Sequence, residues 1–156
     1  MPGDNDSSSL ATRLTQIEDR EAIKELKAAY ARGADAVFNN PGHASAVVLS
    51  ELFTQNGVLD LGGFGRFEGR PALLNAFENI LPQGTKWSTH YILSPIIEFT
   101  AEDKATATWY FRIESVPAGE GATQIAILGN YTDKYRKTPG GWKIRETLTG
   151  YFIPPV

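Results

Sequence analysis

The 156-residue sequence predicts an α+β fold, in which three N-terminal helices pack on one face of a cone-shaped, curved antiparallel sheet. Apolar residues recur at every third or fourth position as far as residue 53, and a further helix is expected over residues 71–80. From residue 86 onward the period is two, as in strands with one buried face. Short turns separate these strands, so successive strands pair as an antiparallel meander. A long sheet twists, and a twisted sheet closed off by helices predicts an enclosed pocket.

The first part of the chain predicts a short tail and one long helix. Residues 1–8 are polar and acidic and predict a disordered tail, whereas residues 9–156 predict a single domain. Helical period begins after the tail, and the capping-box pattern Thr15–Glu18 predicts that the helix restarts there. From Asp19 the apolar stripe continues as far as Asn39–Gly42, a sequence that is typical of a helix end.

The rest of the chain predicts two more helices, a small hairpin and four long strands. The second helix is expected at His43–Phe53 and the third at Pro71–Ile80, because proline is well tolerated in a first turn. Between them, residues 58–61 and 65–69 predict a hairpin around a glycine-rich turn. Pro95 cannot donate a hydrogen bond to a neighbouring strand, which predicts a bulge or an edge position. The long strands are expected at Lys86–Phe99, Ala105–Ser115, Thr123–Lys137 and Trp142–Phe152.

Composition and charge exclude several classes of protein. With 15 Lys and Arg, 18 Asp and Glu, a net charge of −3 and no basic cluster, we expect neither a nucleic-acid nor an anionic membrane partner. The absence of cysteine excludes disulfides, thiolate zinc sites, iron–sulfur clusters and cysteine nucleophiles. The two histidines lie far apart in sequence, so we expect no metal site. The polar start of the chain and the lack of a long apolar stretch predict a cytoplasmic location.

The strand that carries His90 is the first candidate for chemistry. Strand alternation places Ser88, His90 and Ile92 on one face. Histidine changes charge near neutrality, so a histidine among apolar neighbours could take a proton from a substrate carbon or hydroxyl group. It would need a carboxylate to fix its tautomer. The alternative is a structural histidine that bonds backbone or solvent.

Further side chains could take part. Asp35, near the end of the long helix, is the carboxylate that we would pair with His90, although a regular helix places it on the solvent side. Tyr30 lies on the apolar stripe, where its hydroxyl could bond a substrate oxygen or serve in core packing. Tyr131 and Asp133 share one strand face. Asp133 is either a second acid or, as we favour, the cross-strand ion-pair partner of a lysine or arginine.

Several short segments follow one another in a characteristic order and spacing. They are Ile17–Ile23, Leu52–Thr54, the turn at Gly69, Thr89–Tyr91, Asn130–Tyr135 and Gly140–Ile144. Together they resemble the SnoaL-like branch of the nuclear-transport-factor-2-like superfamily, over nearly the whole chain from about residue 10. The resemblance implies the fold that the pattern predicts, an α+β cone with a curved antiparallel sheet.

Within this superfamily the chain is most similar to the hexachlorocyclohexane dehydrochlorinases and, more loosely, to the scytalone dehydratases, which are cofactor-free lyases built around a His–Asp dyad. The resemblance therefore implies no cofactor, His90 and Asp35 as the dyad, and Tyr30 in a pocket position. Thr147 stands where the dehydrochlorinases carry an arginine, and the second histidine of the dehydratases has no counterpart, which argues against their particular substrates. The implied substrate contacts are Tyr131, Leu59, Leu61, Ser88, Phe111, Ile113, Ile127, Gly129, Thr147 and Thr149.

Three kinds of function fit this sequence. A cofactor-free lyase, with His90 as general base, would eliminate a group from a small, mostly apolar or cyclic substrate, as a dehydratase does. An isomerase or cyclase in the same pocket needs the same base, and a non-catalytic module that binds small molecules or assembles with partners is the third. In each case we expect a homodimer or homotrimer. Its contact would use the aromatic and β-branched outer faces of strands 86–99 and 105–115, where Trp87 and Tyr91 lie.

Overall fold

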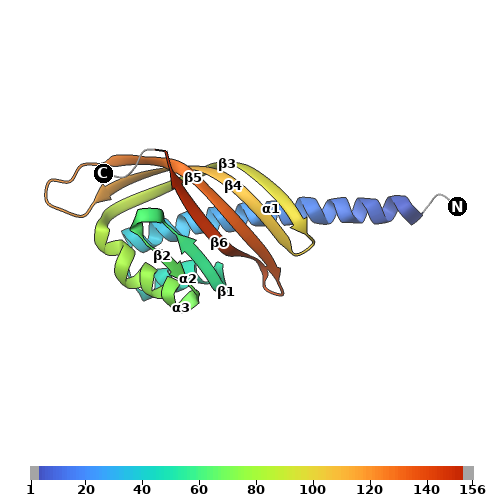
Figure 1. The fold of residues 1–156 in the computed structure, drawn as a ribbon, viewed down its shortest axis with the longest axis horizontal. Helices are drawn as coiled ribbons and strands as arrows, with labels where there is room; N and C mark the ends of the chain where they lie inside the picture. Colours follow the sequence, from blue (N-terminus) through green and yellow to red (C-terminus); the bar gives the residue numbers. More distant parts are fainter. Residues whose placement is uncertain (1–3, 153–156) are drawn as a thin grey trace.

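Three helices and a six-stranded sheet make up the part of the chain that the structure describes (Figure 1). This computed structural model describes the backbone of residues 4–152 and the side chains of residues 9–152. The helices are α1 (Asp4–Asn39), α2 (His43–Ser50) and α3 (Arg70–Asn75). Helix α3 continues through a π turn, η2 (Ala76–Ile80), into a 3₁₀ turn, η3 (Leu81–Gly84). The α+β class and the three helices are therefore confirmed.

Helix α1 begins earlier than the sequence predicts. Residues 4–8, predicted as part of a disordered tail, are helical, and residues 1–3 lie outside the described part of the chain. The helix does not restart at Thr15, whose hydroxyl donates to the carbonyl of Ala11 (3.1 Å) within one continuous helix. Once a helix has formed, each added residue gains one backbone hydrogen bond, so a polar segment can extend it. The extended half of α1 projects beyond the sheet (Figure 1).

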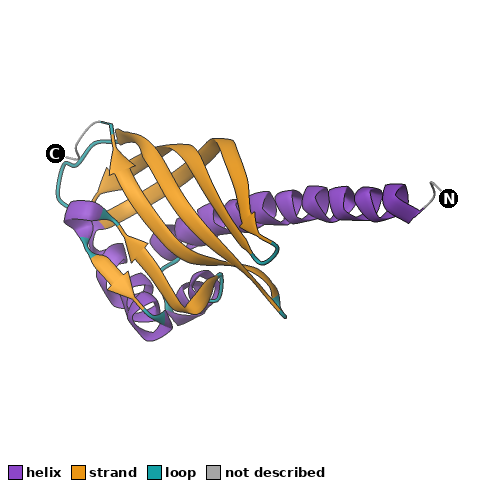
Figure 2. Ribbon diagram, turned by 45° about the vertical axis from the view of Figure 1, so that its right-hand side comes forward, coloured by secondary structure: helices purple, strands orange, loops and turns teal. Residues whose placement is uncertain are grey.

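The strands form one curved sheet that wraps around the C-terminal half of α1 and the shorter helices (Figure 2). They are β1 (Phe53–Asp60), β2 (Arg66–Glu68), β3 (Thr85–Ala101), β4 (Lys104–Pro117), β5 (Ile125–Thr138) and β6 (Gly141–Tyr151). Their order across the sheet is β2-β1-β6-β5-β4-β3. Among the last four strands, β3 pairs antiparallel with β4, β4 with β5 and β5 with β6, so the predicted meander is confirmed.

The sheet is mixed, which corrects the prediction of a wholly antiparallel sheet. β1 pairs antiparallel with β2 but parallel with β6, and Leu59 lies opposite Thr147 in that parallel pair. Sequence pattern reveals pairing between consecutive strands joined by short turns, whereas most of the chain separates β1 from β6. β2 and β3 are the two edges, so the sheet is not closed.

Helix α1 covers the β3 edge of the sheet with polar side chains. Asn39 accepts a hydrogen bond from the Ser88 N–H (2.9 Å) and donates one to the Ser88 carbonyl (2.8 Å). One helical turn earlier, Asp35 Oδ1 accepts a hydrogen bond from the His90 N–H (2.8 Å). An edge strand presents a row of unpaired backbone groups, and these side chains satisfy them where a further strand would lie.

Pro95 lies on this same edge strand. The register between β3 and β4 shifts between Leu93 and Ile96, so the strand bulges there. Both settings predicted for the proline, a bulge and an edge, are therefore confirmed.

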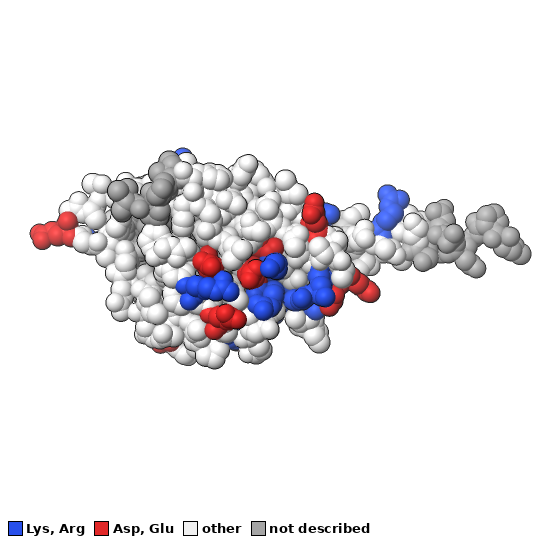
Figure 3. Space-filling model, viewed as in Figure 1, with Lys and Arg blue, Asp and Glu red and all other residues white. Residues whose placement is uncertain are grey.

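Charged side chains of both signs gather in a band over β1 and β6 on the face drawn in Figure 3. In this region Arg66 pairs with Asp60 (3.1 Å), and Lys134 of β5 pairs with Glu146 of β6 (2.7 Å). Exposed apolar side chains are found instead on β3 and β4, and include Trp87, Tyr91, Ile96 and Tyr110. No helix within residues 4–152 is long and apolar enough to cross a membrane.

Candidate functional site

A cavity of about 210 Å³ lies between α1, the shorter helical segments and the concave face of the sheet, where the sequence predicts a pocket. Its lining is mostly apolar with a few polar groups, which is typical of a site for a small molecule. The predicted site residues that line it are Tyr30, Leu59, Leu61, Ser88, His90, Ile113, Ile127, Tyr131 and Thr149.

Three residues predicted as substrate contacts lie outside the lining. Phe111 and Gly129 face each other on β4 and β5, and a Cβ atom at Gly129 would lie 2.5 Å from Cζ of the Phe111 ring. That ring packs against Tyr131, with 4.5 Å between ring centres, and Tyr131 itself lines the cavity. Thr147 is 0% exposed and lies opposite Asp133, deeper in the core. The prediction therefore identified the correct face of the sheet, but it did not separate the residues that line the cavity from those that lie outside its lining.

Other lining residues were not predicted as part of the site. Ala34 and Val37 continue the apolar stripe of α1, so the helical period could have placed them. Ser115 and Tyr151 follow two residues after predicted lining residues on β4 and β6, so strand alternation could also have placed them. The remaining lining residues come partly from short turns, in which apolar residues have no regular spacing. They are Phe38, Leu49, Phe64, Phe77, Leu81, Gly84 and Thr85.

The structure brings His90 and Asp35 into contact. Nδ1 of His90 lies 2.7 Å from Oδ1 of Asp35, the same oxygen that accepts the His90 backbone N–H. A carboxylate only accepts hydrogen bonds, so this contact places the imidazole proton on Nδ1 and leaves Nε2 able to take a proton. The side chain of His90 is 7% exposed and that of Asp35 is 25% exposed. The Phe38 ring stacks on the imidazole, with 6.0 Å between ring centres and 11° between the planes.

The helical period alone suggested that Asp35 lies on the solvent face of α1. The structure places it against strand β3 instead. The helix packs with one stripe on the concave face of the sheet and with a second flank against the β3 edge, and Asp35 lies on that flank. The hydroxyl of Thr89 donates a further, long hydrogen bond to Asp35 Oδ2 (3.4 Å). Backbone and side-chain donors of one strand therefore hold the carboxylate in place.

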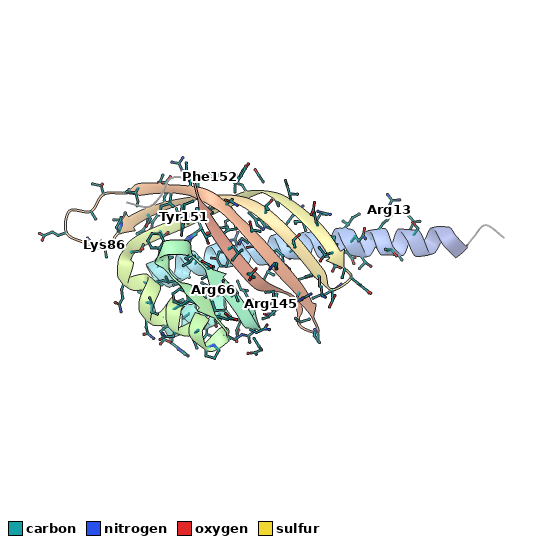
Figure 4. All side chains as sticks on the ribbon, in the orientation of Figure 1. Arg13, Arg66, Lys86, Arg145, Tyr151 and Phe152 are labelled. Atoms are coloured by element: carbon teal, nitrogen blue, oxygen red, sulfur yellow. The ribbon has the colours of Figure 1, made fainter. Side chains whose placement is uncertain are left out.

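Tyrosines supply the other polar groups on this side of the sheet. Burial raises the pKa of Tyr30, Tyr131 and Tyr135, and it raises that of Tyr151 to about 12. These four inward tyrosines are thus protonated near neutral pH and can donate hydrogen bonds. Tyr151, labelled near the end of β6 in Figure 4, donates to the Leu61 carbonyl (3.2 Å).

Asp133 forms a buried ion pair, as predicted in preference to a second catalytic acid, but its partner lies on helix α1 and not on a neighbouring strand as expected. Its Oδ2 lies 2.8 Å from Nζ of Lys27, and both side chains are almost wholly buried. Among the described residues, no group of three or more His, Cys, Asp or Glu side chains is placed to hold a metal ion.

Comparison with known proteins places this geometry in a family. Residues 15–147 match the model of the SnoaL-like domain, so the protein belongs to that family. A hexachlorocyclohexane dehydrochlorinase (LinA, type 2) is similar in structure, with a TM-score of 0.80 and 21% identity over 92% of this chain and 93% of that chain. The resemblance inferred from the sequence is therefore confirmed.

Two structures from Novosphingobium aromaticivorans are also similar. An NTF2-like protein with a cystatin-like fold has a TM-score of 0.76 and 26% identity over 99% of this chain and 95% of its own. A proposed scytalone dehydratase from strain DSM 12444 has a TM-score of 0.76 and 19% identity over 89% of this chain and 87% of its own. These likenesses establish the NTF2-like fold of the chain.

Proposed function

We propose that the protein is a cofactor-free lyase that eliminates water from a small, cyclic hydroxyketone, with His90 as the general base. The observation that carries this proposal is the 2.7 Å contact between His90 Nδ1 and Asp35 Oδ1, beside a cavity that the imidazole lines. A carboxylate at that distance orients the ring and stabilises the imidazolium that forms when Nε2 takes a proton.

The elimination needs no oxidant, reductant or metal. His90 Nε2 takes the proton from the carbon next to the substrate carbonyl, and the C–H electron pair forms an enolate. The enolate then reforms the carbonyl and makes a carbon–carbon double bond as the β-hydroxyl group leaves. The leaving oxygen takes the proton back from the imidazolium and departs as water, so His90 returns to its neutral form.

The two buried tyrosines of the lining hydrogen-bond each other, and the one hydroxyl proton left in this pair is the candidate donor to the enolate oxygen. Tyr30 and Tyr131 contact each other edge to face, with 5.9 Å between ring centres. A donor aimed at a developing oxyanion typically contributes about 10²–10³-fold in rate when the site excludes water. With a neutral phenol as donor, the negative charge of the intermediate is stabilised without a buried cation in direct contact.

The lining also favours an uncharged substrate. None of the described residues that line the cavity is Asp, Glu, Lys or Arg. A charged substrate group would lose its hydration there without gaining an ion-pair partner. A departing halide would meet the same difficulty, because no Lys or Arg among the described residues lines the cavity. Loss of hydroxide as water, with a proton supplied by His90, suits this cavity better.

Turnover of a substrate panel tests the proposal. Hydroxycyclohexanones and hydroxytetralones are incubated with the protein, and enone formation is followed by ultraviolet absorbance and mass spectrometry. We expect His90→Gln to lower the rate by at least about 10²-fold, because general-base catalysis is lost. His43→Gln is the matched control, because the His43 side chain is 68% exposed and pairs with Glu78 (3.0 Å).

The products separate the competing functions. Full activity in a folded His90→Gln variant would contradict the mechanism. A double bond that moves without loss of water would instead identify an isomerase that uses the same base. Tight binding of panel compounds with no reaction would favour a binding module.

A further inference from the structure

A charged pair lies directly beneath the two tyrosines that line the cavity. Lys27 of α1 has 1% of its side chain exposed, and its Nζ lies 2.8 Å from Oδ2 of Asp133, which is 0% exposed. The same Nζ lies over two aromatic rings, 4.4 Å from the centre of the Tyr30 ring and 4.0 Å from that of Tyr131. Both tyrosines line the cavity, whereas neither charged residue does.

The core holds the aspartate of this pair in place. The Tyr135 hydroxyl donates to Asp133 Oδ2 (2.5 Å), and Trp109 Nε1 donates to that hydroxyl (3.1 Å). Thr147 faces Asp133 in the register of β5 and β6, and its hydroxyl has no hydrogen-bond partner within the described residues. The carboxylate position is therefore set by side chains of the sheet, beneath the cavity.

Stability alone does not account for the pair. Taking two charges out of water is costly, and buried ion pairs can often be replaced by apolar side chains without loss of stability. Burial lowers the pKa of Lys27, and the Asp133 carboxylate opposes this effect. The pair does one thing that apolar residues cannot do, which is to hold a cation against two ring faces.

This contact constrains the geometry of both rings. An ammonium group is attracted to the negative face of an aromatic ring, so a ring that moves away loses the attraction. The Tyr30 and Tyr131 rings stand at 79° to each other, and Lys27 contacts both of them. Burial, together with the Asp133 carboxylate of the pair, raises the pKa of Tyr30 and Tyr131, so both hydroxyls stay protonated.

We propose that Lys27 and Asp133 are positioning residues of the cavity, which fix the hydrogen-bonded pair Tyr30 and Tyr131 so that the one hydroxyl proton left in this pair meets an oxygen of the bound ligand. Neither charged residue touches the ligand, and both act through the two rings. The role of that oxygen in catalysis rests on the proposed function, whereas the selection of an oxygen-bearing ligand does not. Binding therefore tests the pair without turnover.

Phenol and toluene are suitable probes, because they differ by a hydroxyl in place of a methyl group. Both are small compounds of the size that a cavity of about 210 Å³ admits. Isothermal calorimetry should show that the wild-type protein binds phenol about tenfold more tightly than toluene, the effect of one further hydrogen bond in an apolar site. The double variant Lys27→Met/Asp133→Asn removes both charges together and keeps the side-chain volumes similar. We expect it to retain its affinity for toluene and to lose its preference for phenol.

The matched control is Lys134→Met/Glu146→Gln, which removes a partly exposed ion pair (2.7 Å) from β5 and β6. We expect this control to keep the preference for phenol. If the first double variant does not fold, Tyr135→Phe loosens Asp133 while both charges remain, and it should lower the preference in part.

The proposal is overturned if the folded Lys27→Met/Asp133→Asn variant still prefers phenol. If this double variant does not fold, an unchanged preference in Tyr135→Phe overturns it. So does a wild-type protein without any preference. Equal loss of affinity for both probes also overturns it, because it indicates a role in folding and not in positioning. A wild-type protein that prefers phenol but converts no hydroxyketone contradicts the proposed function alone.

Discussion

Replacing Asp35 with asparagine separates the electrostatic role of this side chain from its structural role. Asparagine has nearly the same shape, and its oxygen can still accept the His90 backbone N–H, which lies 2.8 Å from Asp35 Oδ1. The negative charge beside the imidazole is lost. We therefore expect Asp35→Asn to fold, with a free energy of unfolding within about 1 kcal/mol of the wild type, and to be a poor catalyst.

The size of the catalytic effect follows from the geometry. At 2.7 Å between Nδ1 and Oδ1, and with an effective dielectric constant of about 20, the imidazolium and the carboxylate attract each other by about 6 kcal/mol. The Asp35 side chain is 25% exposed, so water screens part of this energy, and we take about half of it. A loss of about 3 kcal/mol from the transition state lowers the rate by roughly 10²-fold.

The assay compares initial rates of enone formation, with chemical denaturation measured in the same buffer. Asn39→Ala is the control, because it removes two hydrogen bonds to the same edge strand but no charge. It should lower the free energy of unfolding by about 1–3 kcal/mol and leave kcat nearly unchanged. A folded Asp35→Asn variant with a rate close to that of the wild type would refute the assignment of the dyad.

Three further predictions concern the rest of the molecule. Gly129→Ala should destabilise the fold by at least about 2 kcal/mol in chemical denaturation, because the new Cβ would lie 2.0 Å from the Gly150 carbonyl oxygen. The free energy of unfolding should fall as the pH rises from 10 toward 12, because phenols ionise in the unfolded chain while the four inward tyrosines keep their protons in the folded one. In the folded protein, tyrosinate absorbance at pH 11 should correspond to no more than two of the six tyrosines in the sequence. Light scattering should detect the predicted dimer or trimer, and Tyr110→Lys, on the exposed apolar face of β4, should shift it toward the monomer.

The elements with a clear period were predictable from sequence. Strand alternation placed His90 with Ser88 on the inner face, and it placed Tyr131 and Asp133 together. The parallel pairing of β1 with β6 was not predictable, because residues 61–140 separate the two strands and no local signal links them.

Helix α1 shows what the helical period predicted correctly and what it did not. The stripe that contains Tyr30 predicted the face on the sheet, but Asp35 was misplaced because the helix also packs with a second flank on the β3 edge. Lys27 lies on the stripe itself, four residues after Ile23 and three before Tyr30. A lysine at such a position is the one sequence signal that could have revealed the buried ion pair.

Exchange of carbon-bound protons tests the central claim, which is that His90 takes a proton from carbon. Tetralone carries the acidic carbon but no leaving group, so any reaction stops at proton abstraction and return. In heavy water, the wild-type protein should catalyse deuterium uptake next to the carbonyl, as measured by mass spectrometry, and His90→Gln should reduce this uptake to the rate without protein. Equal uptake with the wild-type protein and with His90→Gln would contradict the claim.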